Sequence, residues 1–347
     1  MTTASILRPS SRRRSTLLDA AQTVPQPKHG LRYLTPGEYP LWDALVGVSL
    51  QGNVLCRSWW LNALRADVRV LGYFAENRLV AGIPLYFERR LGLTVCRMPK
   101  LVHTWGVIME PIEGKNVTVA SREIEILTAF AKELANQRFF IQSFHPTLLN
   151  WLPFYWNGFR QMTYFGYVFE NLTNLDKIWE QMDGSVRQNI RKAEKKGITV
   201  VPCSSTLVSA TAEKTFKHQH KSLPYSREYL SQIYSAAKEN GAGECFAAID
   251  KEGRTHAATF LVWDRKRAYN LASGSDPELR SSGAESFLLW HLFGVTADRA
   301  EAFDFAGSVV QRIERFERGF GATLVPYNRI LKLPGPLQAY CALMGIL

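Results

Sequence analysis

A loop of small residues that leads directly into a helix is the stretch of this sequence whose residue types best suit chemistry. Residues 274–283 are rich in Gly, Ser, Asp and Pro, and apolar residues recur at helical spacing from Ala284 onward. The first turn of a helix presents free backbone N–H groups and the positive end of the helix dipole, which favour a phosphate or another anion. The residues expected to surround such an anion are Arg280, Ser281, Ser282, Gly283 and Ala284. The same pattern also suits an ordinary strand-to-helix connection.

A strand is expected on each side of this loop and helix. Residues 267–273 alternate Tyr269 and Leu271 with smaller or polar residues, and a second strand begins near 303 and stops at a glycine. In the second strand Asp304 lies between two phenylalanines, so its side chain points to the opposite face, either into a cleft or into solvent. Tyr269 is the other candidate for proton transfer, although a tyrosine in a strand also suits the core.

A second group of candidates is a basic run in a helical segment, made of Arg187, Arg191, Lys192, Lys195 and Lys196. Arg187 and Arg191 lie one turn apart and share a face. Such a run suits either a solvated surface or the binding of a phosphate-bearing substrate. His218 and His220 are two residues apart and would not share a helical face, so no metal site is expected there.

The composition is that of a globular chain, and its length of 347 residues allows one large or two medium domains. No apolar run reaches the length of a membrane span. The five cysteines are scattered and form no Cys-x-x-Cys pair, which argues against a zinc site or a disulfide framework and suits a reducing compartment. The net charge of +11 predicts an anionic partner, such as a nucleotide cofactor, a tRNA or an anionic membrane surface.

The chain divides into a tail and two blocks. Residues 1–28 are expected to form a disordered basic tail, because four arginines precede the first acidic residue in a Ser/Thr-rich leader. The block 29–170 predicts a hairpin at 68–87. Thr35-Pro36-Gly37-Glu38 predicts a helix start with a capping box. Further helices are expected at 58–66 and 122–137, and strands at 31–34, 138–144 and 151–170.

The second block, 171–347, follows a similar order. Helices are expected at 175–196, 226–240 and 312–320, with another that ends at His220. Strands are expected at 198–202, 244–249, 256–263 and 323–331, besides those next to the loop. The hairpins at 74–87 and 246–263 resemble each other, and in each block the hairpin precedes a strand, a long helix and another strand. We therefore expect an internal duplication of one α/β unit.

Two motifs give this arrangement a family resemblance. Residues 185–200, SVRQNIRKAEKKGITV, resemble a signature of Fem-type peptidyltransferases and related acyltransferases of the GNAT superfamily. FDFAGS at 303–308 and IERFERGFGATLVPY at 313–327 resemble the C-terminal signature of the same group. The motifs cover residues 171–330, and the N-terminal half matches mainly in layout. The resemblance implies an α/β fold of two tandem GNAT-like domains, each a mixed, mostly antiparallel sheet, and acyl transfer from acyl-CoA or an aminoacyl-tRNA to an amine.

The sequence departs from the family pattern at two positions. The pyrophosphate loop of GNAT enzymes normally ends in Gly or Ala, but Glu285 stands at that place and would crowd or repel a pyrophosphate. Fem-type enzymes that use tRNA usually carry Phe-Lys before Gly-Phe-Gly, whereas this chain has Phe316-Glu317. The second change inverts a charge that is linked to transfer from tRNA. Arg318 would replace that lysine poorly, because a guanidinium fork does not act as a point charge.

Acyl transfer to an amine requires a neutral amine, a stabilised oxyanion and a protonated leaving group. By the resemblance, backbone N–H groups near Leu271 and Ser273 would hold the donor and its oxyanion. Tyr269 would protonate a leaving thiolate, and Asp304 would bind or deprotonate the amine. The remaining substrate contacts are expected from Arg187, Arg191 and Phe316.

We therefore expect a cytoplasmic N-acyltransferase that uses acyl-CoA or acetyl-CoA and no metal, with an acceptor amine on a sugar, a cell-envelope precursor or a small metabolite. One alternative is a tRNA-dependent peptidyltransferase acting on a peptidoglycan precursor, which the charge favours and Glu317 disfavours. Another is a catalytically silent GNAT-like binding protein of envelope biosynthesis, which Glu285 suits. The apolar C-terminal segment PLQAYCALMGIL suits either a peripheral contact with the inner membrane face or a cap on the core.

Overall fold

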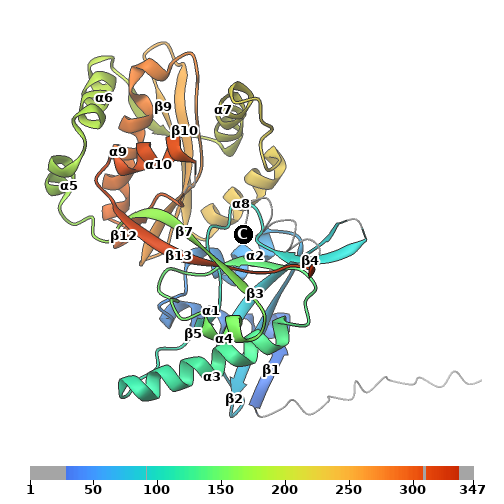
Figure 1. Ribbon diagram of the computed structural model, residues 1–347. Coiled ribbons are helices and arrows are strands. Elements are labelled where there is room, and N and C mark those ends of the chain that lie inside the picture. The colour runs from blue at the N-terminus through green and yellow to red at the C-terminus, as the bar shows by residue number, and fades with distance from the viewer. Residues whose placement is uncertain (1–28, 91, 308–309, 336–347) are drawn as a thin grey trace, which may run out of the picture.

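The computed structural model describes residues 29–335 except residue 91 and residues 308–309. The chain forms two lobes, and Figure 1 shows the N-terminal lobe below the C-terminal lobe. The strands of both lobes join into one sheet in the order β1-β2-β3-β4-β6-β13-β7-β12-β11-β10-β9-β8, with β5 paired to β3. The tail predicted at 1–28 and the apolar segment at 336–347 lie outside the described residues.

The N-terminal lobe contains a set of mostly antiparallel strands with helices around them. Its strands are β1 (His29–Tyr33), β2 (Asp67–Ala75), β3 (Arg78–Arg90), β4 (Leu93–Arg97), β5 (Ile108–Met109) and β6 (Phe140–Ser143). Its helices are η1 (Pro36–Glu38), α1 (Tyr39–Val48), η2 (Val54–Cys56), α2 (Ser58–Ala63), α3 (Asn116–Leu134) and α4 (Leu152–Trp156). The capping box expected at Thr35 and Glu38 is present, as is the hairpin of β2 and β3.

The C-terminal lobe carries the loop and helix with which the sequence analysis began. Its strands are β8 (Thr199–Pro202), β9 (Gly243–Ile249), β10 (Thr255–Trp263), β11 (Arg267–Ser275) and β12 (Ala302–Asp304). Its helices are α5 (Leu175–Gln181), α6 (Gly184–Lys195), α7 (Ser205–His218), α8 (Arg227–Glu239), η3 (Arg280–Ser282), α9 (Ala284–Ala297) and α10 (Gln311–Arg318). Strands β8 to β11 pair antiparallel in chain order, and β12 joins β11 in parallel.

Two long strands, β7 (Arg160–Phe169) and β13 (Thr323–Lys332), connect the lobes (Figure 1). They pair antiparallel from Thr323 opposite Val168 to Leu331 opposite Arg160. β7 also reaches the C-terminal lobe, where its last residues pair with β12, and β13 reaches the N-terminal lobe, where its last residues pair with β6. The sheet is therefore continuous across the lobes, and the division of the chain at residue 170 stays a prediction.

Three predicted elements differ from the structure. The single helix expected at 175–196 is two helices, because the chain turns at Met182 and the Asp183 side chain caps α6 by accepting the N–H of Ser185. The strand expected at 151–170 begins only at Arg160, because Pro153 lies in the first turn of the short helix α4. α3 begins at Asn116, before its predicted start.

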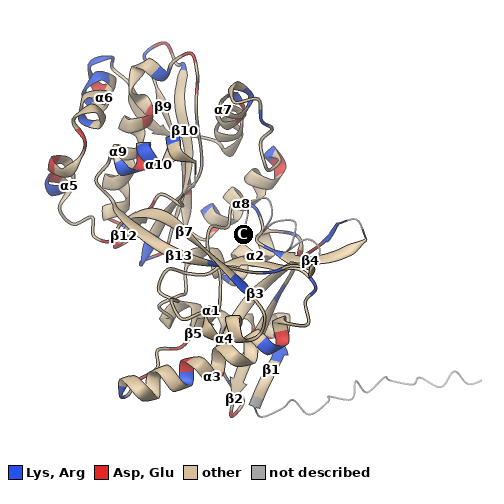
Figure 2. Cartoon of the chain, in the orientation of Figure 1, with Lys and Arg blue, Asp and Glu red and all other residues tan. Residues whose placement is uncertain are grey.

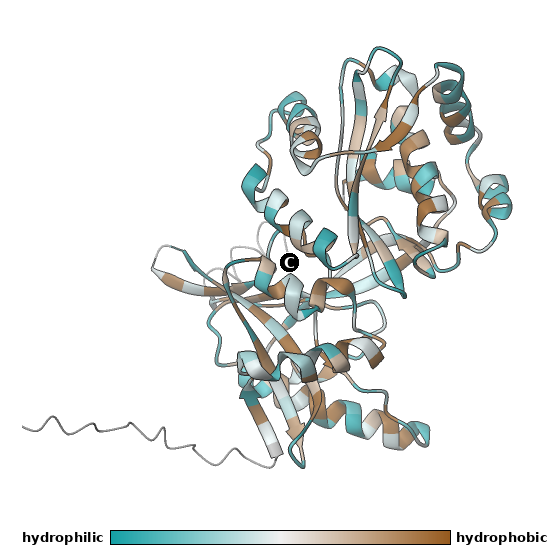
Figure 3. Cartoon of the chain, turned by 180° about the vertical axis from the view of Figure 1, so that it is seen from behind, coloured by the Kyte–Doolittle hydropathy of each residue, from teal (hydrophilic) through white to brown (hydrophobic). Residues whose placement is uncertain are grey.

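Three groups of buried apolar residues hold the sheet and helices together. One lies between the lobes and includes Trp42, Trp60 and Tyr269, the second lies between α6, α9 and the sheet of the C-terminal lobe, and the third packs α3 against the N-terminal lobe. Figure 3 shows apolar stretches along the strands of both lobes. Within the described ranges, no helix has both the length and the apolar character needed to cross a membrane.

Candidate active site

The sheet of the C-terminal lobe opens where β11 and β12 part. Their parallel pairing runs from Arg267 opposite Ala302 to Tyr269 opposite Asp304, and β11 then continues to Ser275 while the chain after Asp304 turns through positive φ at Ala306 and Gly307. On the other side of β11, Asn270 and Ala272 pair with consecutive residues of β10, which leaves Leu271 as the extra residue of a β-bulge. The part of β11 that holds Leu271 and Ser273 therefore lies beyond the described pairing with β12.

The loop that follows β11 is built tightly against α6. Gly283, in the left-handed region at φ 82°, is the residue before α9. A Cβ atom at this position would lie 2.1 Å from the backbone oxygen of Asn189 on α6. A glycine is therefore required here both by the backbone conformation and by the close approach of the two helices. This packing, rather than the approach of a ligand, accounts for Gly283.

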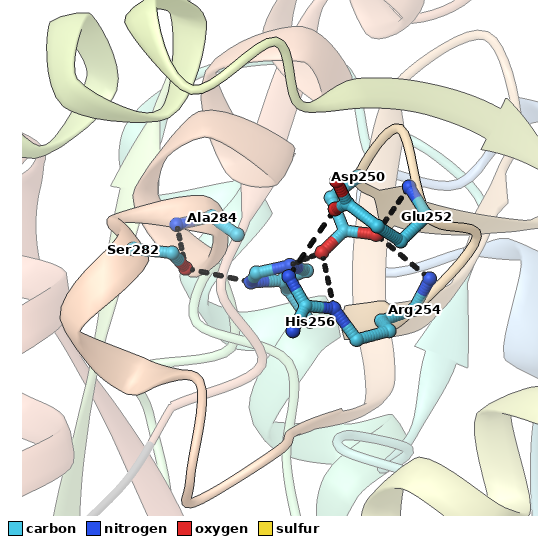
Figure 4. Close-up of polar contacts among 6 residues, drawn as sticks. All are labelled: Asp250, Glu252, Arg254, His256, Ser282 and Ala284. Carbon is cyan, nitrogen blue, oxygen red and sulfur yellow. Dashed lines mark hydrogen bonds and ion pairs between the residues drawn. The ribbon is translucent and has the colours of Figure 1, made fainter.

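A chain of hydrogen bonds fixes the same loop to the turn between β9 and β10 (Figure 4). The Asp250 carboxylate accepts a hydrogen bond from Nε2 of His256 at 2.9 Å, and Nδ1 of His256 lies 3.0 Å from Oγ of Ser282. In the tautomer whose Nε2 donates to Asp250, Nδ1 accepts a hydrogen bond from the Ser282 hydroxyl group, and the Ser282 oxygen in turn accepts the N–H of Ala284 at 3.3 Å. All three side chains are buried, so this chain of polar groups orients the loop from beneath.

The predicted anion-binding residues divide into those that face outward and those that support the loop. Ser281 is exposed and Arg280 is half-buried, whereas Ser282, Gly283 and Ala284 are buried. Glu285 is exposed in the first turn of α9. Its carboxylate therefore stands near the positive end of the helix dipole, the place that a donor phosphate would take.

Asp304 lies at the point where the two strands part, and it is buried with 3% exposure. Its Oδ1 accepts the N–H of Ala306 at 2.8 Å, and its Oδ2 accepts a hydrogen bond from Arg267 at 3.2 Å. The same guanidinium reaches Glu170 at 3.0 Å. Asp304 therefore does not point into solvent, which was one of the two orientations expected from its place in the strand.

Glu317 on α10 is a second buried carboxyl group near Asp304. It is 5% exposed, and its Oε2 has no hydrogen-bond partner among the described residues. Burial raises its pKa to about 8, and the negative charges of Asp304 and Glu314 add to the effect. Glu314 lies one turn away and is held by Tyr167 and Arg318. Glu317 is thus a carboxyl group that titrates near neutral pH in an enclosed position.

Two further residues close this cluster from the side of the N-terminal lobe and β13. The ring of His103 packs edge-on against Tyr327, with 5.0 Å between ring centroids. Its Cε1 atom would lie 3.0 Å from a Cβ atom on Gly307, so the histidine borders the turn after Asp304. Burial lowers the pKa of His103, although the charge of Asp304 opposes this, and burial raises the pKa of Tyr327. Sequence reasoning proposed neither residue as functional: His103 lies 201 positions before Asp304 in the chain, and Tyr327 entered only as the last residue of the C-terminal signature at 313–327.

Tyr269 is brought next to Asp304, its register partner on the neighbouring strand. It is 1% exposed and belongs to the apolar cluster between the lobes. Burial raises its pKa well above the ordinary value, and its hydroxyl has no hydrogen-bond partner among the described residues. Its role as the acid for a leaving group stays a prediction that requires the open part of β11 to admit the donor.

The three predicted substrate contacts have structural partners, and their role in substrate binding stays a prediction. Arg187 donates from one nitrogen to the carbonyl oxygens of Trp179, Glu180 and Met182, at 3.1, 2.9 and 2.7 Å, and so caps the end of α5. Arg191 stacks on the ring of Trp179, and Phe316 packs against Phe320. Figure 2 shows Lys and Arg beside Asp and Glu on α5, whereas α6 is mainly basic.

The cluster can move a proton and stabilise a charge beside an open strand edge. Glu317 can accept a proton, and Asp304 forms an ion pair with Arg267. Beyond Tyr269, backbone N–H groups of β11 are not paired with β12 and can hold an oxyanion. Among the described residues, no group of three or more His, Cys, Asp or Glu side chains is placed to hold a metal ion.

Comparisons with known proteins bear on the fold and the family of the chain. Residues 184–310 match the model of a family described as an acetyltransferase (GNAT) domain. No curated protein sequence matches the chain. Among solved structures, FemX has a TM-score of 0.63 at 14% identity, covering 86% of this chain and 96% of that chain. A conserved protein of unknown function from Bacteroides thetaiotaomicron has a TM-score of 0.56 at 12% identity, covering 87% and 99%.

A tandem GNAT protein from the clavulanic acid biosynthesis pathway has a TM-score of 0.52 at 10% identity, covering 87% of this chain and 97% of that chain. These likenesses confirm the predicted α/β fold with its tandem, Fem-like arrangement of GNAT-like units. The matched segment contains β11, the loop, α9 and β12, and thus Tyr269, Asp304 and the residues expected around an anion. Glu317 lies just beyond it.

Proposed function

We propose that this chain, which carries a GNAT-type acetyltransferase domain at residues 184–310 of a tandem Fem-like fold, transfers an acyl group from acyl-CoA to an amine. The acceptor amine belongs to a sugar, a cell-envelope precursor or another small metabolite. The four described cysteines are free, and we place the reaction in the cytoplasm.

The observation that carries the proposal is a pair of buried carboxyl groups, Asp304 where β11 and β12 part and Glu317 near it on α10. An amine is protonated in water and must lose a proton before it can attack a carbonyl carbon. The ionised form of Glu317, whose pKa is about 8 and whose Oε2 has no partner among the described residues, accepts that proton, while Asp304, which accepts a hydrogen bond from Arg267, lies beside it and attracts the ammonium form. The two carboxyl groups thus take different roles because their surroundings differ.

The donor would lie along the open part of β11. Backbone N–H groups near Leu271 and Ser273 hold the carbonyl oxygen as it becomes negative, and Arg280 and Ser281 at the start of α9 contact the phosphates. The nitrogen–carbon bond forms as the carbon–sulfur bond breaks, and the thiolate takes up a proton. Glu285 at the same helix start works against tight binding of a pyrophosphate, so we expect modest donor affinity.

Two measurements test the proposal. Thermal unfolding with free CoA, acetyl-CoA, a long-chain acyl-CoA or bulk tRNA, each at two salt concentrations, identifies the donor, because a ligand at about 100 times its Kd adds roughly 2.7 kcal/mol of stability. Release of free thiol from the best acyl-CoA, measured with a panel of amines, then identifies the acceptor. Glu317→Gln should lower kcat by about 100-fold or more while the donor still stabilises the fold.

A response to tRNA alone would instead support a peptidyltransferase that uses aminoacyl-tRNA, a candidate that the net charge of +11 favours. The glutamate in place of the family's lysine argues against it. Donor binding with no thiol release for any amine would favour the third candidate, a silent GNAT-like binding protein of envelope biosynthesis. Full activity of Glu317→Gln would remove the glutamate from the mechanism.

A further inference from the structure

An apolar surface is exposed on α4 and on the turn before it. Leu149, Leu152, Tyr155 and Trp156, which we call the α4 patch, are 67%, 47%, 53% and 58% exposed. The other side of the helix is buried, because Phe154 packs edge-on against Phe144 in the core of the N-terminal lobe. This short helix is thus apolar on both sides, and the core explains only one of them.

The chain segments that flank the patch are basic. No Asp or Glu occurs between Arg138 and Phe169, or after Glu317, in the whole sequence. Lys332 is opposite Phe140 at the start of β6, and Leu331 is opposite Arg160 at the start of β7. Arg138, Arg160 and Lys332 therefore lie at one end of three adjacent strands, the end at which α4 leads into β7.

These cations differ in how strongly they are held. Arg138 and Arg160 are exposed. Lys332 donates to the carbonyl oxygen of Ala135 at the end of α3. The nearest acids along the chain are Glu133 on α3 and Glu170 after β7, and Glu170 is paired with Arg267. The arginines thus leave net positive charge beside the exposed aromatic side chains.

We propose that the α4 patch and its arginines dock the protein on the surface of an anionic lipid bilayer. Tyr and Trp have an apolar ring with one polar group, which suits the boundary between lipid and water. Each of the four side chains exposes on the order of 100 Å², so the patch covers about 400 Å². A stable protein interface needs roughly 800 Å² per partner. Weak insertion combined with attraction to anionic headgroups is a pairing that gives stable peripheral binding.

The position of the patch keeps the candidate active site outside the lipid. β7 runs from Arg160 beside the patch to Val168, which is the register partner of Asp304. Eight residues of strand span about 26 Å. Docking would therefore hold the opening between β11 and β12 above the headgroups. The inference does not depend on the acyl donor, and it holds even if the proposed function fails.

The test is co-sedimentation of the full chain with vesicles of phosphatidylcholine alone and of phosphatidylcholine with 30% phosphatidylglycerol, the fraction being a choice of roughly physiological anionic charge. We expect binding to the anionic vesicles that weakens as salt rises. Leu152→Ser with Trp156→Ser should lower binding about fivefold or more, and Arg138→Gln with Arg160→Gln should remove most of the preference for anionic lipid.

The matched control is Leu41→Ser with Val48→Ser on α1 of the same lobe, whose side chains are 51% and 61% exposed but lie outside the patch. It should bind like the parent protein, and thermal unfolding confirms that every variant is folded. The proposal is overturned if the parent does not bind anionic vesicles, or if the Leu152/Trp156 variant binds as well as the control. It is also overturned if that variant instead dissociates a dimer in sedimentation velocity, since the patch would then join two copies of the chain.

Discussion

Glu317 shows how one side chain can be useful to a reaction and unfavourable to the fold. Burial denies a carboxyl group that is 5% exposed, with one oxygen lacking a partner, the hydration that stabilises its ionised form in water. The charge of Asp304 nearby adds repulsion, so the proton stays on Glu317 up to a pH of about 8. The group is then a base of suitable strength for an amine, because its pKa lies close to neutral pH.

The raised pKa predicts a specific dependence of stability on pH. An unfolded glutamate loses its proton near pH 4.5, and Glu317 in the folded protein loses it near 8, so the folded state holds more protons between these values. The contribution of this group to stability is therefore complete below pH 4.5 and declines as pH rises to 8. At pH 9, Glu317→Gln should unfold at a higher urea concentration than the parent, with a free energy of unfolding greater by on the order of a few kcal/mol. At pH 4.5 the free energies of unfolding of the two proteins should be almost equal.

The neighbouring carboxylate provides the control for this prediction. Hydrogen bonds from Tyr167 and Arg318 lower the pKa of Glu314, so its contribution to stability changes with pH in the opposite direction to that of Glu317. Glu314→Gln should therefore give no gain in stability at pH 9. Equal behaviour of the Glu317 variant and the parent at both pH values would show that Glu317 ionises normally in the folded protein.

At the scale of secondary-structure elements, the loop before α9 depends on a partner two strands away. Ser282 is tied to His256 and through it to Asp250 in the turn between β9 and β10. We expect Ser282→Ala to raise the KM for the donor several-fold more than it lowers kcat, because the loop loses its orientation while Glu317 is untouched. The buried nitrogen left without a partner should also lower stability by about 1–3 kcal/mol. Steady-state kinetics with varied donor measure the first effect.

Ser281→Ala is the matched control, since it removes the same hydroxyl group from the adjacent residue, which is exposed. It should leave stability unchanged. If both variants behave alike in stability and in kinetics, the hydrogen bond to His256 does not orient the loop.

The charge of Glu285 in the first turn of α9 gives a further prediction. The Glu285 carboxylate occupies the positive end of the helix dipole, so its removal should favour a phosphate-bearing donor. We expect Glu285→Gln to tighten the binding of CoA by about two- to five-fold at low salt, measured by isothermal titration, and less at high salt. Glu278 is an exposed charged residue in the loop before η3, and Glu278→Gln serves as the comparison. It should change the affinity for CoA less than Glu285→Gln does. Weaker binding by the Glu285 variant would place the phosphates elsewhere.

Local signals predicted the elements better than they predicted the cluster around Asp304. The hairpins, the loop and α9 follow from turn residues and from spacing of apolar residues over short windows. The break between α5 and α6 was missed because apolar spacing continues through Met182, and only the cap by Asp183 reveals it. The role of His103 could not be predicted, because its contact with Tyr327 joins residues far apart in the chain.

At the scale of the whole molecule, β7 and β13 make each lobe depend on the other. The segment 171–347 by itself would lack β7, the strand that pairs with both β12 and β13. We expect this fragment to fail to fold and the whole chain to unfold in one cooperative transition. Circular dichroism and urea unfolding of the purified fragment measure the outcome. A fragment of residues 158–347 keeps β7 and should retain more structure, whereas cooperative unfolding of 171–347 alone would show that it folds independently.

The pairing of β13 between β6 and β7 also affects how the chain is synthesised. A ribosome completes β7 at Phe169 and reaches β13 only at Thr323. At about 5–20 residues per second, roughly 8–30 s pass before the partner strand exists. During that time the edges of β6 and β7 that β13 will pair with are still exposed. Exposed strand edges readily pair with other chains. Until β13 is made, the risk that these two strands pair with another nascent chain therefore follows from the topology rather than from any one residue.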